Sequence, residues 1–232
     1  MARVPVHLRP SAPIAADALL PGDPGRALLL AQELMTEPRM SNHRRGLWGY
    51  HGHTESGHEL TIQSTGVGGP SAAIVIEELI ELGVRRAIRV GTCGALDPQL
   101  GLGKLVVVSG ALADDGTSQA LGSRGVIEPH PALTEALRAA SPEAVAGPVA
   151  STDLFYEPDP TARERWVEAG CIAVEMEAAT LLTLATRHAI QAACVLIVSD
   201  TGPADARQRL DDEQLEQHAR EMGRAALAAL EA

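Results

Sequence analysis

The chain has 232 residues, of which 45% are hydrophobic and 21% are charged. These values are typical of a globular protein with a sizeable core, and they exclude disordered and fibrous classes. The formal charge of −11 argues against a general nucleic-acid or anionic-membrane surface, so any anion must bind in a local basic pocket.

The cysteines and the absence of a targeting signal bear on the compartment. Cys93, Cys171 and Cys194 lie in apolar or glycine-flanked settings without metal-ligand spacing, so we expect reduced core residues. Neither a signal peptide nor an apolar run long enough to span a membrane is found in the sequence. We therefore expect one cytoplasmic domain over residues 1–232, with neither nucleic acid nor membrane as a partner.

The first predicted strand and helix are joined by a segment that could bind an anion. The strand is predicted over residues 15–20 and the helix over 27–34, with residues 21–26 (PGDPGR) between them. Backbone N–H groups at a helix start, together with the Arg26 guanidinium, would make a phosphate-sized site. The alternative is a purely capping segment, with Pro24 at an early helical position.

A basic cluster and a glycine-rich loop follow. Residues 41–45 (SNHRR) precede a strand-like stretch at 47–50 and form either a solvated loop or a contact to a ligand, including one held by a neighbouring subunit. A strand at 60–64 and a helix at 72–82 flank the loop 65–71. This loop lacks the spacing of a dinucleotide-binding motif, which excludes a nicotinamide-cofactor site, but its glycines allow a close approach to a ligand.

The central predicted strand covers residues 87–90 and ends in residues 91–94 (GTCG). Arg89 is out of place in such a buried strand unless an anionic group meets it. The two glycines would let the backbone approach a ligand, beside the hydroxyl and N–H of Thr92. The alternative is a plain strand with a glycine-rich exit and an arginine that extends to solvent.

The middle of the chain is predicted to continue the alternation of strands and helices. A strand, a surface excursion, a helix, a strand and a second helix are expected at residues 104–109, 113–130, 131–140, 147–150 and 160–170. Phe155, the single phenylalanine of the chain, follows the second of these strands. It is either a core residue or a face against a planar base.

Carboxylates mark the last two strand ends. An apolar strand beginning at residue 172 carries Glu175 and Glu177 where it turns into a helix that ends near residue 188. Buried there, both carboxylates are costly unless satisfied, although the helix dipole favours them. The last strand, residues 193–198, ends in Ser199 and Asp200, and a long helix follows over 211–232.

Polar side chains thus stand at the exit of several predicted strands. They are Arg26, Thr65, Arg89 with Thr92, Phe155, and Ser199 with Asp200. Because ligands bind outside the carboxyl ends of strands in open α/β sheets, this agreement predicts one site along one edge of the sheet.

Four motifs, taken together and in order, resemble a known family. Residues 21–26 (PGDPGR), 89–94 (RVGTCG), 174–178 (VEMEA) and 198–200 (VSD) are similar to the nucleoside phosphorylases of the purine/uridine phosphorylase superfamily, with the bacterial-type hexameric purine enzymes as the nearest pattern. The resemblance implies an α/β subunit, a three-layer α/β/α arrangement with a central mixed, partly barrel-like sheet. It also implies a homohexamer built as a trimer of dimers.

The resemblance further implies roles for individual residues. Phosphate would be bound by Gly22, Arg26, Arg89 and Thr92, with Arg45 (or Arg44 beside it) lent by the adjacent subunit. The ribose would be held by Met176, Glu177 and the neighbour's His7, and the base by Phe155, Val174, Glu175 and Ser199. Asp200 matches the acid that serves purines, with Arg207 and Arg209 as approximate candidates to assist it.

The implied reaction is the reversible phosphorolysis of purine ribo- or deoxyribonucleosides. Phosphate, the co-substrate, attacks C1′ while the bond to the base breaks, and protonated Asp200 donates to N7 of the leaving base. We expect neither a metal nor an organic cofactor.

Other activities of related chains fit the sequence less well. Residues 64–71 (STGVGGPS) and 77–79 (EEL) also resemble uridine phosphorylases, but Asp159 and Thr161 stand where those enzymes read the pyrimidine, and Asp200 favours purines. A hydrolytic nucleosidase would not need the phosphate arginines. A non-catalytic nucleoside-binding relative would be expected to lose Asp200 or Glu177. The choice between 6-oxo and 6-amino purines stays open.

Overall fold

The computed structural model describes residues 4–202 and 206–232, and the strands among them form one sheet. The strands are β1 (Asp17–Leu20), β2 (Thr36–Asn42), β3 (Gly49–His53), β4 (Glu59–Gln63), β5 (Arg86–Ala95), β6 (Leu105–Ala113), β7 (Val126–Ile127), β8 (Val145–Ser151), β9 (Ala173–Glu175), β10 (Gln191–Thr201) and β11 (Gln208–Arg209). The helices are α1 (Pro24–Leu34), the short 3₁₀ turn η1 (Arg44–Gly46), α2 (Gly69–Glu81), α3 (Gly116–Ala120), α4 (Pro131–Ala140), α5 (Ala162–Glu168), α6 (Ala178–His188) and α7 (Asp212–Glu231).

The sheet is mixed and closes partly on itself. Its order is β11-β10-β6-β8-β9-β5-β1-β4-β3-β2, and β5 also pairs with β10. That extra pairing joins β5, β10, β6, β8 and β9 into a ring, while β1 to β4 extend from it as an open sheet. The neighbours of β1 and the β5–β10 pair run parallel, whereas β9 is antiparallel to β5. The predicted mixed, partly barrel-like sheet is confirmed.

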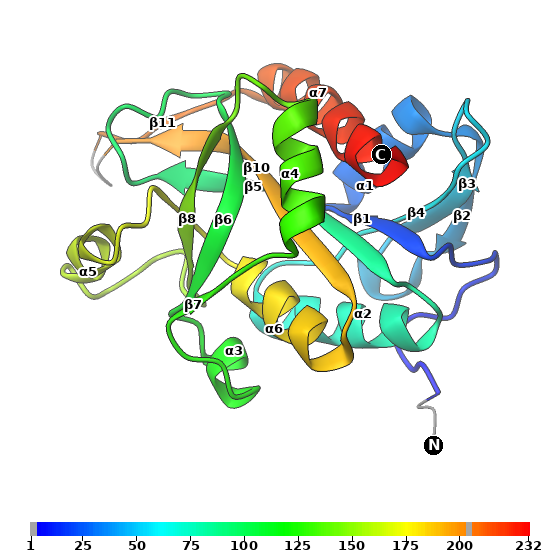
Figure 1. The fold of residues 1–232 in the computed structure, drawn as a ribbon, viewed down its shortest axis with the longest axis horizontal. Helices are drawn as coiled ribbons and strands as arrows, with labels where there is room; N and C mark the ends of the chain where they lie inside the picture. Colours follow the sequence, from blue (N-terminus) through cyan, green and yellow to red (C-terminus); the bar gives the residue numbers. More distant parts are fainter. Residues whose placement is uncertain (1–3, 203–205) are drawn as a thin grey trace.

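Helices cover both faces of the sheet, as Figure 1 shows, with α2 and α6 on one side and α1, α4 and α7 on the other. Each side has its own buried apolar cluster. The first includes Leu79 of α2 and Leu181 of α6, and the second includes Leu30 of α1 and Met222 of α7. Strands buried on both faces explain why β5 and β10 read as nearly continuous apolar runs in the sequence.

Local sequence signals set several helix ends. Asp23 caps α1 by accepting the N–H of Arg26 at 2.7 Å, and Pro24 begins that helix, as its fixed φ allows. Asp211 and Gln214 form a reciprocal capping box at the start of α7. Helix α4 covers the predicted residues 131–140.

The structure corrects the sequence analysis in three places. Residues 91–94 were predicted as a turn after the central strand, but β5 continues through them to Ala95 because β10 pairs alongside, with Leu196 opposite Gly91. The predicted surface excursion 113–130 contains α3 and β7. Strand β2 was not predicted, because its residues are mostly exposed and give no apolar pattern.

None of the helices built from the described residues is both long and apolar enough to cross a membrane.

Candidate functional site

Arg89 lies near the middle of β5, almost completely buried, between two carboxylates. Its Nε donates to Glu175 Oε2 at 3.0 Å, and its Nη2 lies 2.5 Å from Glu177 Oε2. Burial alone would lower the pKa of Arg89, but the two carboxylates raise it overall, so the guanidinium stays charged. The expectation that a buried Arg89 meets an anionic group is thus met by the protein's own side chains.

The Glu175 side chain is 0% exposed and is held by donors of the protein. Its carboxylate accepts from the Ser151 hydroxyl and from the backbone N–H groups of Glu177 (2.8 Å) and Ala178 (2.9 Å), where α6 begins. These N–H groups have no partner within the helix, so the carboxylate satisfies them. The buried carboxylate of Glu175 holds Arg89 in place, and the expectation that Glu175 lines the base pocket stays a prediction.

Glu177 joins three separate elements. One carboxylate oxygen accepts the N–H of Gly68 at 2.5 Å and the other pairs with Arg89. Gly68 has a φ of +85°, a conformation that glycine adopts without strain, so the loop before α2 can turn its N–H toward Glu177. Burial raises the pKa of Glu177, and the Arg89 charge opposes that rise. Met176 and Val174 lie half-buried on either side of Glu175.

Arg26 lies half-buried in the first turn of α1, and its charge interacts with those of this cluster. Burial lowers its pKa, Asp23 and Glu177 raise it, and the Arg89 charge lowers it further. Arg26 is therefore close enough to Arg89 and Glu177 for their charges to act on it. The half-buried Arg26 and the buried Arg89 thus bring two positive charges near one carboxylate, an arrangement that favours a bound anion.

Gly22 and Thr92 border this cluster. The Gly22 carbonyl accepts the N–H of Gly66 at 3.0 Å, and a Cβ on Gly22 would lie 3.2 Å from the Gly66 carbonyl oxygen. The loops before α1 and α2 therefore lie against each other. Thr92 is half-buried on β5, three residues beyond Arg89.

Two glycines of β5 make room for charged side chains. A Cβ on Gly91 would lie 2.7 Å from Cζ of Arg89, and a Cβ on Gly94 would lie 3.0 Å from Oδ1 of Asp200. The distance at Gly91 is too short for real atoms, and the one at Gly94 is tighter than most real contacts, so a larger residue at either position would displace the neighbouring side chain. The expectation that both glycines serve a close approach of the backbone to a ligand stays a prediction.

Asp200 lies near the end of β10, beside an irregularity in the pairing with β5 that places two β10 residues against one. Its side chain is 14% exposed; Oδ1 lies 3.5 Å from Nε of Arg207, and Oδ2 lies 3.2 Å from the Ser199 hydroxyl. Arg209 is the β11 partner of Asp200. Of the two arginines named from the sequence, Arg207 is the one whose guanidinium pairs with Asp200.

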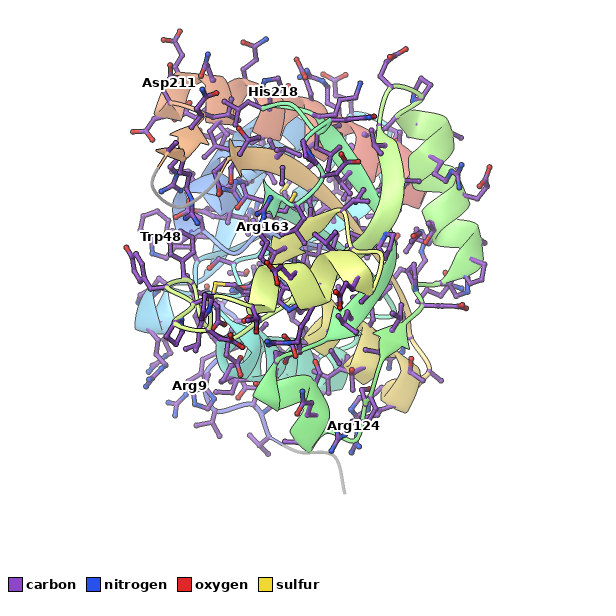
Figure 2. All side chains as sticks on the ribbon, turned by 90° about the vertical axis from the view of Figure 1, so that its left-hand side faces the viewer. Arg9, Trp48, Arg124, Arg163, Asp211 and His218 are labelled. Carbon is purple, nitrogen blue, oxygen red and sulfur yellow. The ribbon has the colours of Figure 1, made fainter. Side chains whose placement is uncertain are left out.

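An aromatic side chain and a cavity lie next to this acid. The Phe155 ring is 46% exposed, and Cζ of Arg207 lies 5.4 Å from its centroid. A cavity of about 670 Å³ lies past the ends of β5 and β10, with Thr201 in its wall. Arg163, labelled in Figure 2, reaches from α5 and donates to the carbonyls of Ala95 and Leu96 at the end of β5.

Two predicted site residues lie apart from this cluster. His7 is tied to α2 through Glu78, and Arg45 is exposed in η1; within the described residues no recorded contact joins either to Arg89 or Glu177. Arg45 has a φ of +58°, a strained conformation for a residue with a side chain. The carbonyl of Leu47, at the end of this turn, accepts from Asn42 at 2.6 Å and Gln63 at 3.1 Å.

The sequence analysis missed the residues that hold the site in place. Gly68, Asn42 and Glu78 lie in stretches that the sequence singled out, but they received no role, and Ser151 and Gln63 lie outside those motifs; all five contact site residues or the turn that carries Arg45. Glu78 appeared in the sequence analysis only as part of the motif at residues 77–79, with no role of its own. Over the part of the chain that the structure describes, no three His, Cys, Asp or Glu side chains gather as they would around a metal.

Comparison with known proteins agrees with this arrangement. The sequence model of the family described as "Phosphorylase superfamily" matches residues 17–232. The chain is 36% identical over 196 residues to a "Purine nucleoside phosphorylase DeoD-type" of Caldanaerobacter subterraneus subsp. tengcongensis, covering 81% of this chain and 84% of that protein. It is 35% identical over 227 residues to a "Guanosine phosphorylase" of Halorubrum lacusprofundi, covering 95% and 93%. A DeoD-type relative from Clostridium beijerinckii is 36% identical over 204 residues, covering 84% and 85%.

Proposed function

The chain belongs to the phosphorylase superfamily, and from this premise we propose that its site carries out the reversible phosphorolysis of purine nucleosides. The products are the free purine and ribose or deoxyribose 1-phosphate. The observation that carries the proposal is the group formed by the buried Arg89–Glu177 ion pair and the half-buried Arg26, whose charge acts on both. Such a group suits an anionic nucleophile beside a polyhydroxylated sugar.

Phosphate binds between the loop before α1 and the middle of β5. Arg26 and Arg89 neutralise its charge, while Thr92 and the backbone at Gly22 add hydrogen bonds. Nε and Nη2 of Arg89 are occupied by carboxylates, and the contacts recorded among described residues leave its Nη1 to face the ion. Because Glu175 fixes this guanidinium from behind, the charge is already in position when phosphate arrives.

The sugar is held by Glu177 next to the phosphate. Its carboxylate accepts from the 2′- and 3′-hydroxyls, and Met176 packs against the ring. Fixing the sugar beside the bound ion brings a phosphate oxygen to C1′, which replaces a bimolecular encounter with an oriented one. As the C1′–N9 bond breaks, the sugar gains oxocarbenium character, and the adjacent anion stabilises that positive charge.

Asp200 acts on the leaving base. In its protonated form it donates to N7 as negative charge builds on the purine, and Arg207, which pairs with it, stabilises the carboxylate that results. Phe155, Val174 and Ser199 border the plane of the base. Inorganic phosphate is the co-substrate, and no step of this scheme requires a metal or an organic cofactor.

Neighbouring subunits complete the site in this proposal. Arg45 supplies a third cation to the phosphate of the adjacent subunit and His7 contacts the ribose 5′-hydroxyl there, which suits a homohexamer built as a trimer of dimers. Both residues stand outside their own chain's cluster, and the strained backbone at Arg45 is typical of functional positions. The three free, buried cysteines suit the reducing cytoplasm.

Release of free base from inosine, adenosine, guanosine and uridine, each with and without phosphate, tests the proposal. We expect phosphate-dependent release from purine nucleosides. Release without phosphate would point to a hydrolase, and cleavage of uridine alone would overturn the purine assignment.

A further inference from the structure

We infer that Glu78 is a positioning residue, which fixes His7 so that its Nε2 can accept a hydrogen bond from the ribose 5′-hydroxyl in a neighbouring site. The inference rests on the role proposed above for His7. It deepens that role by naming the group that sets the orientation and tautomer of the ring.

The Glu78 carboxylate, on α2, binds the N-terminal segment through several donors at once. It accepts the backbone N–H groups of Val6 (3.0 Å), His7 (3.0 Å) and Leu8 (2.6 Å). The same carboxylate lies 2.8 Å from Nδ1 of the His7 ring. One side chain therefore fixes both the backbone and the ring of His7.

Side-chain packing contributes little to holding the N-terminal segment in place at His7. Val6 is 62% exposed, Leu8 is 2% exposed, and a cavity of about 330 Å³ lies between the segment and α2. The chain is thus anchored by an apolar side chain only beyond His7. At His7 and before it, the hydrogen bonds to Glu78 determine where the chain lies.

The Glu78 side chain is ionised when it accepts these hydrogen bonds. Burial by itself raises the pKa of Glu78, but the N–H groups of Leu8 and His7 lower it overall. The adjacent carboxylate, Glu77, pairs with His188 of α6 at 3.1 Å and so has a different use.

Ionised Glu78 also selects one tautomer of the neutral His7 ring. A carboxylate only accepts, so the proton of the ring must be on Nδ1. Nε2 then carries a lone pair and can accept from a hydroxyl group. Carboxylates that orient a functional histidine in this way are common around metal-bound histidines, and the same physics applies to a sugar hydroxyl.

The test compares two substrates on each preparation: inosine and 5′-deoxyinosine, with phosphate in excess. The ratio of their kcat/KM values isolates the 5′-hydroxyl, and it does not depend on the fraction of folded enzyme. Glu78→Gln keeps the shape of the side chain but turns an NH₂ group toward the N–H donors. We expect this variant to lower the ratio about tenfold, the loss of one hydrogen bond, while cleavage of 5′-deoxyinosine changes by less than about twofold.

Three further variants complete the experiment. Glu81→Gln removes one negative charge from an exposed position of the same helix and should leave the ratio unchanged. His7→Ala should lower the ratio as much as Glu78→Gln does, and the double variant should lower it no further than either single variant. If His7→Ala lowers the ratio and Glu78→Gln does not, the inference is wrong and the role of His7 stands. If His7→Ala leaves the ratio unchanged, the role of His7 fails and the inference with it, whereas phosphorolysis itself is judged by the phosphate dependence above.

Discussion

At the scale of single residues, the site depends on two positions of β5 that carry no side chain, Gly91 and Gly94. Gly91 and Gly94 leave empty volume on a buried strand, and the guanidinium of Arg89 and the carboxylate of Asp200 fill it. The backbone at neither glycine has a positive φ. Space therefore favours glycine at both positions, and a single added methyl group probes each charged group separately.

Gly94→Ala should impair the acid and leave phosphate binding intact. Its Cβ would lie 3.0 Å from Oδ1 of Asp200, so the carboxylate has to move by a few tenths of an ångström; since a displacement of about 1 Å can cost on the order of 10²-fold in rate, this smaller shift should cost about tenfold. We expect kcat for inosine to fall by about that factor with little change in the KM for phosphate. Gly91→Ala, placed against Arg89, should instead raise the KM for phosphate.

Gly101→Ala is the matched control, because a Cβ there meets nothing within 4 Å. Steady-state kinetics with each substrate varied in turn separates the three variants. If Gly94→Ala and Gly91→Ala change the same parameter to the same extent, the division of β5 into a phosphate end and a base end is wrong.

At the scale of elements, the role proposed for Arg45 is supported by the strained backbone of the turn η1. Arg45 has a φ of +58° and a ψ of +21°, and the turn is held at the Leu47 carbonyl by Asn42 and Gln63. A strained position of this kind persists where the surrounding structure fixes it and function uses it.

Arg45→Ala and Arg45→Gly should both raise the KM for phosphate by about tenfold, as expected for a lost hydrogen bond to a charged group. Only the glycine variant adopts this backbone without strain, so it should melt at a higher temperature than the alanine variant. Arg44→Ala, next to it in the same turn, should leave the KM for phosphate within about twofold. A larger effect at Arg44 than at Arg45 would transfer the role to Arg44.

The contact between α1 and α7 predicts a pH-dependent contribution to stability. Glu33 of α1 accepts from Arg220 of α7 at 3.0 Å and also pairs with Arg224. The hydrogen bond from Arg220 is the largest cause lowering the pKa of Glu33 below its ordinary value of 4.5. Since the pKa is lower in the folded state, the stabilisation is fully present above about pH 4.5 and is lost as the pH falls through the folded-state pKa.

Glu33→Gln should therefore lower the free energy of unfolding at about pH 7 by up to about 1 kcal/mol, because the pair is partly exposed and screened by solvent. Near pH 3 the difference between the variant and the parent should be smaller than at about pH 7, since protonation of the parent carboxyl removes the pair as the pH falls. Urea unfolding at one fixed protein concentration measures both. Glu135→Gln, which breaks an exposed pair with Arg138 at 4.0 Å, is the control. A difference for Glu33→Gln that is the same at both pH values would contradict this explanation.

Elements whose signals are local could be predicted from the sequence, and those that depend on distant partners could not. The helix over residues 131–140 has its own cap and apolar spacing, so it was predicted to the residue. The continuation of β5 through Gly91 and Gly94 could not be predicted, because it depends on pairing with β10 and on the side chains of Arg89 and Asp200. Likewise, Arg89 could be seen to need an anionic partner, but its partners are 86 and 88 positions away.

At the scale of the whole molecule, the proposal requires sites shared between subunits, because Arg45 and His7 stand apart from the cluster of their own chain. Sharing makes a distinctive prediction for mixed oligomers. A site with a wild-type acid on one chain and a wild-type arginine on its neighbour is intact even when each chain carries one defect.

Co-expression of Asp200→Asn and Arg45→Ala chains should therefore restore part of the activity that each variant lacks alone, when the assay uses phosphate well below the KM of the Arg45→Ala variant and the activity of that variant by itself is subtracted. Co-expressed Asp200→Asn and Arg89→Ala chains are the control, because Asp200 and Arg89 belong to one cluster; in every assembly with this pair each site keeps one defect. Recovery is read as phosphate-dependent release of base per milligram of purified mixture. If the Arg45→Ala mixture recovers no more than the control, Arg45 serves its own chain.

The central claim is that guanidinium groups from α1 and β5 converge on a single oxyanion next to the carboxylate that holds the sugar. A crystal structure of the protein soaked in phosphate or sulfate tests it most directly. We expect one ion in contact with both Arg26 and Arg89, with Glu177 beside it and the ion absent from the Arg89→Ala variant. An ion bound elsewhere, with Arg26 and Arg89 directed into separate regions of solvent, would contradict the claim.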